Sequence, residues 1–202
     1  GWLGSLPKSG SWLNSVKVVL GFLELAFAFK FLSIADQAYH WGILDREIYL
    51  ALWIAIFTLL SFYLLGTFRM PGDSEKKNTS VLGLILAITS FSFVFYLIPG
   101  LFGAPLKGMS GYLPPISGQD FNISSSSQTI LNNDLSGLCE APKYSDFLEL
   151  PHGLSGYFDL AQAKECALAT EKPIFIDFTG HGCVNCREME ARVWSDSRIL
   201  KR

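Results

Sequence analysis

The residues with the clearest chemical potential are two cysteines separated by two residues, in Cys183-Val184-Asn185-Cys186. Disulfide exchange requires a thiolate, whereas a free cysteine is mostly protonated at neutral pH. We expect a helix to begin at Cys183, which would place unpaired backbone N–H groups and the positive end of the helix dipole beside its sulfur. Cys186, one turn later on the same face, is positioned to attack a mixed disulfide. The spacing predicts a redox dithiol, with Cys183 as the attacking thiol and Cys186 as the resolving thiol.

Two acidic residues near this pair are candidates for handling its protons. Asp177 interrupts the apolar run at residues 174–178, so the flanking side chains should bury it. Burial disfavours the ionised carboxylate, and a partly protonated carboxyl can exchange a proton with a buried thiol. Glu190 follows Cys186 by one helical turn. We expect Glu190 either to influence the same sulfur or to be a solvated charge on the helix face.

The main alternative for the CxxC motif is half of a metal site. Structural zinc normally has four ligands, often from a second CxxC or a His pair. His181 lies close to the motif, but Cys139 and Cys166 have no matching spacing. We therefore favour redox chemistry without a bound metal. Cys139 is interpreted as an incidental linker cysteine, and Cys166 as a small apolar packing residue in a helix.

The elements expected to position the motif follow one another closely. Asp159 is a suitable N-cap for a helix over 161–171, which must end at Lys172-Pro173. Residues 174–178 are rich in β-branched and aromatic side chains and predict a short strand. A turn over 179–182 then leads into a helix from Cys183 to about residue 193. A helix, a buried strand, a turn and CxxC at a helix start form a specific arrangement.

The first half of the chain predicts three membrane spans. A bilayer core about 30 Å thick requires about 20 mostly apolar residues in a spanning helix. Residues 48–68 and 80–102 meet this requirement without a charged side chain. Residues 16–32 contain Lys17, Glu24 and Lys30, of which the lysines lie near the ends and can reach the headgroups. Glu24 lies near mid-depth, where it either lines a polar conduit or, as we prefer, is neutral or hydrogen-bonded between helices, some of which can lie outside this chain.

The basic residues of the short loops set the orientation of these spans. Five of them fall on one side of the membrane and three, Lys30, Arg46 and Lys107, on the other. The five are Lys8, Lys17, Arg69, Lys76 and Lys77. This places the loop at 69–79 in the cytoplasm and everything after residue 103 on the outer side, where disulfides persist.

The composition of the chain indicates a linker between the two parts and argues against a nucleic-acid partner. From residue 105 to 151, prolines and a serine run at 124–127 interrupt any helical or alternating period, which indicates a linker. The net charge of −2 and the absence of a Lys/Arg stripe argue against nucleic-acid binding.

The region from Phe175 to Cys186 resembles the thioredoxin superfamily, in which an Asp also lies six residues before the first Cys. With the preceding spans, the match narrows to DsbD-type thiol:disulfide interchange proteins, the cytochrome c biogenesis transmembrane family. Residues 182–190 (GCVNCREME) and 193–196 (VWSD) are similar to their C-terminal domain. Residues 11–17 (SWLNSVK) and 97–105 (LIPGLFGAP) are similar to the late spans of versions from the Bacteroidetes group.

This resemblance implies an electron relay in the bacterial inner membrane. Electrons would come from NADPH through cytoplasmic thioredoxin, cross on a cysteine pair within the spans, and reduce the outer CxxC. A periplasmic thioredoxin-like domain would pass them to protein disulfides and so support cytochrome c maturation. Cys183, Cys186, Asp177 and Glu190 match the family's active-site pattern by position. No bound cofactor other than the redox-active cysteine pair is implied, and the partners are thioredoxin, periplasmic disulfide-bearing proteins and membrane lipid.

Two departures from the family pattern lead us to expect an internal piece of a longer protein. Residues 1–138 contain no cysteine, so the membrane pair should lie in further spans upstream. The thioredoxin-like domain also stops after its active-site helix. The expected organisation is a helical membrane part with three spans over 1–104, a Pro/Ser-rich linker over 105–151, and the first half of a truncated α/β thioredoxin-like domain over 152–202.

Two other functions remain open at this stage. One is a membrane-tethered thiol oxidase or isomerase, which a reduction potential would distinguish from a reductase. The other is a non-enzymatic CxxC chaperone for copper or zinc.

Overall fold

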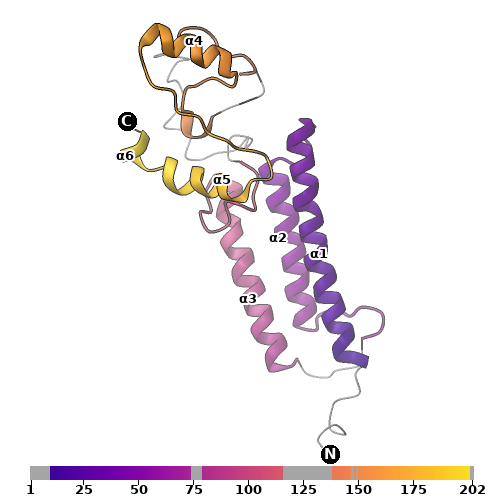
Figure 1. Cartoon of the computed structure of the whole chain (residues 1–202). Coiled ribbons are helices and arrows are strands. Elements are labelled where there is room, and N and C mark those ends of the chain that lie inside the picture. Colours follow the sequence, from indigo (N-terminus) through magenta and orange to yellow (C-terminus); the bar gives the residue numbers. More distant parts are fainter. Residues whose placement is uncertain (1–9, 74–78, 116–137, 147, 149, 201–202) are drawn as a thin grey trace, which may run out of the picture. The chain divides into compact units, whose positions relative to one another are not determined.

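The computed structural model describes residues 10–73, 79–115, 138–146, 148 and 150–200. The chain divides into two compact units, Gly1–Leu106 and Lys107–Arg202, whose elements are labelled in Figure 1. Lys8, Lys76 and Lys77, which contributed to the predicted orientation, lie outside the described residues, as does the serine run at 124–127.

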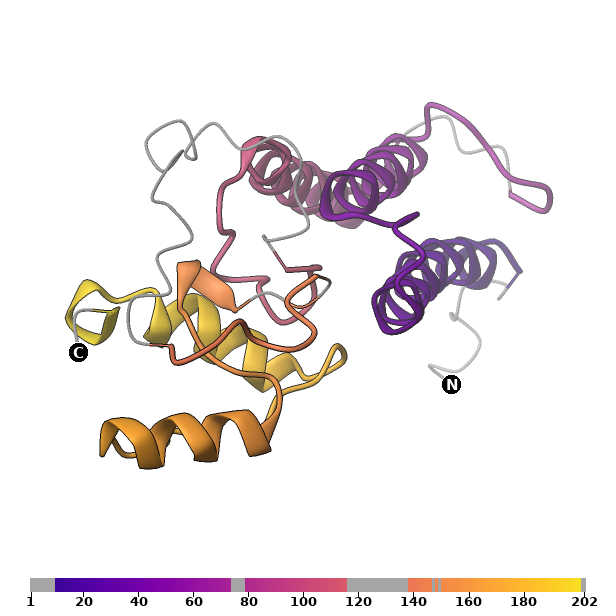
Figure 2. The same ribbon diagram turned by 90° about the horizontal axis from the view of Figure 1, so that it is seen from above.

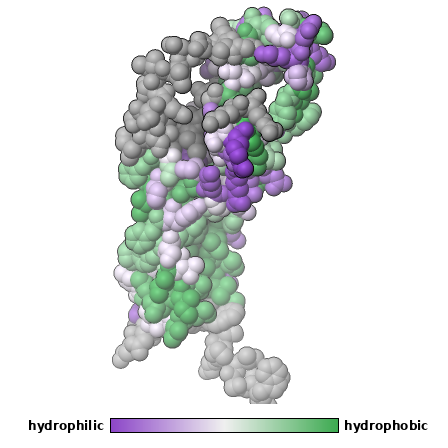
Figure 3. All heavy atoms as spheres, turned by 90° about the vertical axis from the view of Figure 1, so that its left-hand side faces the viewer, coloured by the Kyte–Doolittle hydropathy of each residue, from purple (hydrophilic) through white to green (hydrophobic). Residues whose placement is uncertain are grey.

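The first unit consists of three long apolar helices. They are α1 (Gly10–Tyr39), α2 (Arg46–Leu64) and α3 (Val81–Leu97), and the 3-10 helix η2 (Ile98–Phe102) continues the last. All three are long and apolar enough to cross a membrane, over Leu13–Tyr39, Arg46–Leu64 and Val81–Phe102. Hydrophobic residues cover this unit on the face shown in Figure 3. The three expected spans are therefore present as helices.

The helices differ from the predicted spans at several ends, and α1 already begins at Gly10 rather than at residue 16. α1 continues beyond residue 32 to Tyr39, and the buried carboxylate of Asp36 accepts the N–H groups of Ile43 and Leu44 in the following turn. α2 stops at Leu64 rather than at residue 68, because Gly66 has a left-handed φ of 78° that ends the helix.

Contacts around Trp53 hold the three helices together. Trp53 is only 3% exposed, and its indole N–H donates to the carbonyl of Ala26 in α1 at 3.1 Å. The ring of Phe93 in α3 meets that of Phe57 edge-on at 4.7 Å. The Ser90 hydroxyl donates to the Phe57 carbonyl at 3.0 Å. Polar groups in lipid need protein partners, so these bonds suit a membrane-embedded bundle.

Glu24 does not lie between the helices of this unit. Its side chain is on the exposed face of α1, where Leu20 and Phe27 are also exposed. The preferred interpretation, a neutral or hydrogen-bonded glutamate between helices, therefore stays a prediction that needs a partner helix other than α2 and α3.

The second unit contains short helices. Those in its described residues are the 3-10 turn η5 (Pro151–Gly153), α4 (Leu160–Thr170), α5 (Val184–Met189), the π-helical turn η6 (Glu190–Trp194) and α6 (Ser197–Leu200). The predicted cap is confirmed, since the Asp159 carboxylate accepts the Ala161 N–H at 2.8 Å. α5 begins directly after Cys183 and continues into η6, as expected (Figure 2).

The strand predicted over 174–178 is not formed. Residues 172–180 have no regular structure, and Phe175 and Phe178 are 82% and 87% exposed. A strand needs a neighbouring strand to take up its N–H and C=O groups, and the described residues form no strand beside this segment. The described residues therefore contain no sheet, and the predicted α/β class of this unit is not confirmed.

The described ends of the predicted linker pack within the second unit. Around residue 111, the chain is buried against the start of α5. Residues 139–143 bond to the side chains of Tyr157 and Gln162. These two pieces are docked and do not form a free tether.

Candidate active site

The CxxC motif sits at the start of α5, as the sequence predicts. Cys183 is the N-cap of this helix, and its sulfur accepts the N–H of Cys186 at 3.2 Å. The two cysteines form a disulfide with their Cα atoms 5.3 Å apart, and both are half-buried. On reduction, the free N–H groups of the first helical turn would stabilise a thiolate on Cys183. The geometry therefore suits reversible dithiol–disulfide chemistry.

Glu190 is buried beside this helix and is not a solvated charge. Its side chain accepts a hydrogen bond and ion pair from Arg187 Nη1 at 2.7 Å, and Thr179 Oγ1 lies 3.5 Å from its other oxygen. His152 Nε2 contacts the Glu190 backbone carbonyl at 2.7 Å. Glu190 thus joins α5 to the turn before Cys183 and to η5. Arg187, its partner, was missed in the sequence, although the i,i+3 spacing could have indicated the pair.

Asp177 lies in the irregular segment before the motif. Its side chain is exposed, so the burial expected from its apolar neighbours is absent. The reason is the missing strand, because flanking side chains cover a residue only when the segment packs in a sheet. The segment does reach the dithiol at its far end, where Cys186 Sγ lies 3.7 Å from the Phe178 carbonyl. The role of Asp177 in proton transfer stays a prediction.

A second disulfide joins Cys139 to Cys166, with their Cα atoms 5.5 Å apart. The incidental role expected for Cys139 and the simple packing role expected for Cys166 are therefore both wrong. Their pairing connects residues 27 positions apart, which no local spacing reveals. The available signal was an even number of cysteines, four, all of them on the side of the membrane that the sequence predicts to be the oxidising one.

Side chains in α4 and just before it reinforce this second disulfide. Tyr157 Oη accepts the Cys139 N–H at 2.8 Å. The buried amide of Gln162 accepts the Lys143 N–H at 2.8 Å and donates to Glu140 at 2.6 Å. The segment at 139–143 is consequently fixed to α4 by covalent and polar contacts together.

An ion pair between Lys143 and Asp159 completes this contact, with Nζ and Oδ2 3.0 Å apart. The hydrogen bond from Lys143, followed by that from the Ala161 N–H, holds the pKa of the Asp159 carboxyl below its usual value. The same hydrogen bond raises the pKa of Lys143. Both groups therefore remain charged over a wide pH range.

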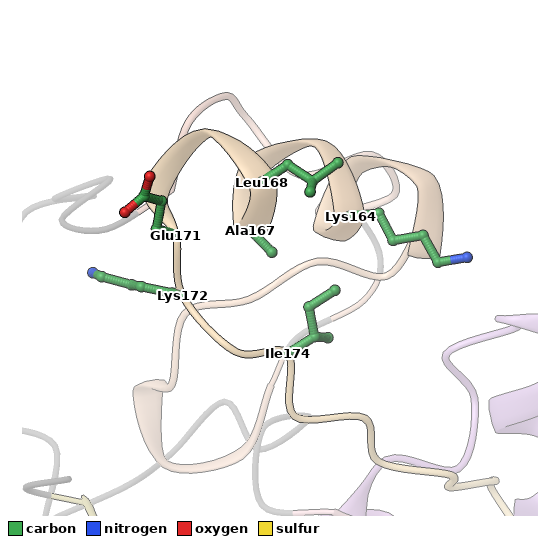
Figure 4. Close-up of a pocket in the computed structure, with 6 residues that line it drawn as sticks. All are labelled: Lys164, Ala167, Leu168, Glu171, Lys172 and Ile174. Atoms are coloured by element: carbon green, nitrogen blue, oxygen red, sulfur yellow. The ribbon is translucent and has the colours of Figure 1, made fainter.

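Away from the dithiol, the described surface has an open cleft but no cluster of metal-binding side chains. A cleft of about 700 Å³ lies between α4 and the segment after it, over Ala167, Leu168 and Ile174 (Figure 4). No cysteine lines it, so it is separate from the dithiol. Within the described residues, no group of three or more His, Cys, Asp and Glu side chains is arranged to hold a metal ion.

Comparison with known proteins agrees with this chemistry. Residues 156–202 match a family model for thioredoxin-like proteins. The chain is 30% identical to the thiol:disulfide interchange protein DsbD of Campylobacter jejuni (strain RM1221), over 96% of the chain and 27% of that protein. It is 26% identical to the thiol:disulfide interchange protein DsbD 1 of Pseudomonas aeruginosa, over 98% of the chain and 28% of that protein. No solved structure matches the chain.

The chain fits a DsbD-type protein. The relatives match both the helical unit and the CxxC unit, so they support a thiol–disulfide oxidoreductase. The chain spans only about a quarter of the length of these relatives.

Proposed function

We propose that this chain carries the outer redox site of a membrane thiol:disulfide interchange protein that reduces protein disulfides. The observation that carries this proposal is the Cys183–Cys186 disulfide at the start of α5, in a chain whose first unit has three membrane-spanning candidates. The similarity to DsbD proteins supports it over nearly the whole chain.

The proposed reaction transfers two electrons and two protons from the dithiol to a partner disulfide. The Cys183 thiolate attacks one sulfur of the partner, forming a mixed disulfide and releasing the first partner thiol. The Cys186 thiolate then attacks Cys183 Sγ, which releases the second partner thiol and leaves the Cys183–Cys186 disulfide. The helix start supports the first step by stabilising the attacking thiolate.

Glu190 and Asp177 are proposed to assist through proton and charge effects. Glu190 is a buried carboxylate four residues after Cys186, held in place by Arg187. We assign it to control of the charge around the resolving thiol. Asp177 is assigned to proton exchange with the same thiol once the segment at 174–178 is covered.

The physiological setting is proposed from the resemblance and from the basic loops. The chain lies in the bacterial inner membrane with the CxxC unit in the periplasm. Electrons arrive from NADPH through cytoplasmic thioredoxin and a cysteine pair within the membrane. The acceptors are periplasmic disulfide-bearing proteins, including those that mature cytochrome c.

The decisive experiment is the reduction potential of the Cys183–Cys186 pair, measured by thiol trapping in dithiothreitol redox buffers. A value near that of thioredoxin, about −270 mV, supports a reductase. A value near that of DsbA, about −120 mV, contradicts it and favours a thiol oxidase. A pair that forms no disulfide but retains zinc or copper stoichiometrically would show a metal chaperone instead.

A further inference from the structure

Residues 107–114, here called the strap, form a folded turn within the second unit. The Tyr112 N–H donates to the Met109 carbonyl at 2.9 Å, and the Ser110 hydroxyl donates to the Lys107 carbonyl at 3.3 Å. Gly111 and Leu113 are buried. In both views of the ribbon, the strap passes beside α5 (Figures 1 and 2). Its position relative to the dithiol is therefore defined by contacts within one unit.

Gly111 of the strap lies against Val184, the first residue between the two cysteines. A Cβ atom on Gly111 would overlap Cγ1 of Val184 and would lie 3.1 Å from its backbone carbonyl. Val184 is β-branched and has little rotamer freedom at the start of a helix. The backbone of the strap thus lies directly against the redox loop, at a distance that only glycine permits.

A second anchor fixes the other end of the strap farther along the same helix. Arg192 Nη2 donates to the Lys107 carbonyl at 3.4 Å. Lys107 also lies near Asp196, whose pKa is lowered first by the side chain and backbone of Arg198 and to a smaller extent by Lys107. The strap is consequently held at both ends of the α5–η6 segment.

We propose that the strap is a built-in cover of the redox loop, which a protein partner must displace to reach Cys183. Attack on a protein disulfide brings the partner's backbone, as well as its sulfur, against Cys183 and Val184. The face at Val184 is already occupied by Gly111, whereas a small reagent needs only the sulfur itself. The strap therefore selects against bulky partners until it is released. This inference rests on the proposed role of Cys183 as the attacking thiol.

The test compares a small and a bulky maleimide on the reduced full chain in detergent micelles. N-ethylmaleimide and a polyethylene-glycol maleimide share the same chemistry, and the rate at Cys183 is located by fragmentation mass spectrometry. The first variant is Gly111→Ala, whose added methyl group cannot fit against Val184. If the cover is open for about a tenth of the time, its removal raises the rate with the bulky reagent by up to about tenfold. The rate with the small reagent should change less than about twofold, since it does not require opening.

A second variant removes the other anchor and has a matched control. Arg192→Ala loses both the bond to the Lys107 carbonyl and the ion pair with Glu188. Glu188→Ala loses only that ion pair and should react like the original chain. The inference is overturned if the bulky-to-small rate ratio is unchanged in both Gly111→Ala and Arg192→Ala while the small reagent reacts normally. If the small reagent fails to modify Cys183 in every variant, Cys183 is not a reactive thiol. This result would contradict the proposed function and, with it, the proposed role of the strap.

Discussion

The two disulfides of the second unit contain the same bond in two different settings. Cys183–Cys186 closes a loop between residues three apart, at the N-terminus of a helix that can stabilise a thiolate. Cys139–Cys166 connects residues 27 apart, and the nearby N–H groups of Cys139 and Lys143 donate to Tyr157 and Gln162. The first setting stabilises the thiolate that disulfide exchange needs, and the second reinforces the closed bond.

Loop length separates the two disulfides further. The loss of chain entropy in the unfolded state grows with the length of the closed loop, to about 3–4 kcal/mol for a 27-residue separation and about 2 kcal/mol for a three-residue separation. Position in the fold, and not the presence of a disulfide, therefore distinguishes a redox site from a structural crosslink.

The largest expected effect follows from removing the attacking thiol. Cys183→Ser should lower the rate of disulfide exchange by roughly a thousand-fold or more, because a hydroxyl replaces the nucleophile. The rate is measured with the reduced chain and a fluorescent disulfide peptide.

The matched control is the double variant Cys139→Ser and Cys166→Ser, which should retain exchange within about threefold because it leaves the nucleophile in place. Comparable losses in both variants would show that the second disulfide takes part in the reaction. The distinction between the two disulfides would then be wrong.

The next effect concerns stability. The same double variant should lower the free energy of unfolding of the second unit by about 3–4 kcal/mol, since the crosslink no longer restricts the unfolded chain. Proteolysis in increasing urea measures this loss on the full chain. A loss of less than about 1 kcal/mol would mean that the hydrogen bonds around Gln162 hold the segment without the disulfide.

The sequence was sufficient where a property is local. The apolar length of residues 48–68 and 80–102 predicts α2 and α3, because a spanning helix needs only enough consecutive apolar side chains. The CxxC motif at the start of α5 was also predictable, since the cap and the helix are encoded within a few residues.

The sequence was insufficient where a property depends on distant partners. The Cys139–Cys166 disulfide requires two segments to meet through packing that no local pattern records. The burial predicted for Asp177 needs a sheet around its segment, and the described residues supply none. Glu190 is buried instead, because His152 and Thr179 approach it from two other segments.

A smaller effect is expected at the ion pair beside the dithiol. Arg187→Gln leaves the buried Glu190 carboxylate without its cationic partner and should cost about 1–3 kcal/mol of stability. Combining it with Glu190→Gln should recover part of this loss, because the unpaired charge is then absent. Urea-dependent proteolysis of the two single variants and the double variant measures the coupling. Additive losses would show that Arg187 and Glu190 act independently.

The smallest effect should come from the charge of Asp159, on the side of the second disulfide. Asp159→Asn retains a side-chain oxygen for the Ala161 N–H but removes the ion pair with Lys143. Since Lys143 lowers the folded pKa of Asp159, the pair contributes stability above the unfolded pKa of 3.8 and loses it as pH falls through the folded value. The raised pKa of Lys143 sets the upper pH limit of this stabilisation. The contribution of Lys143 to stability is complete below its unfolded pKa of 10.5 and is lost as pH rises through the folded value.

The difference in urea midpoint between the original chain and Asp159→Asn should therefore be greatest between about pH 5 and pH 10. It should shrink in about 1 M salt, where exposed charges are screened. Lys143→Gln should reproduce the same pH profile, because it removes the same pair from the other side. A difference that persists undiminished at about pH 2, where the carboxyl is protonated, would contradict the ion pair as its source and indicate that the asparagine disturbs the cap of α4 itself.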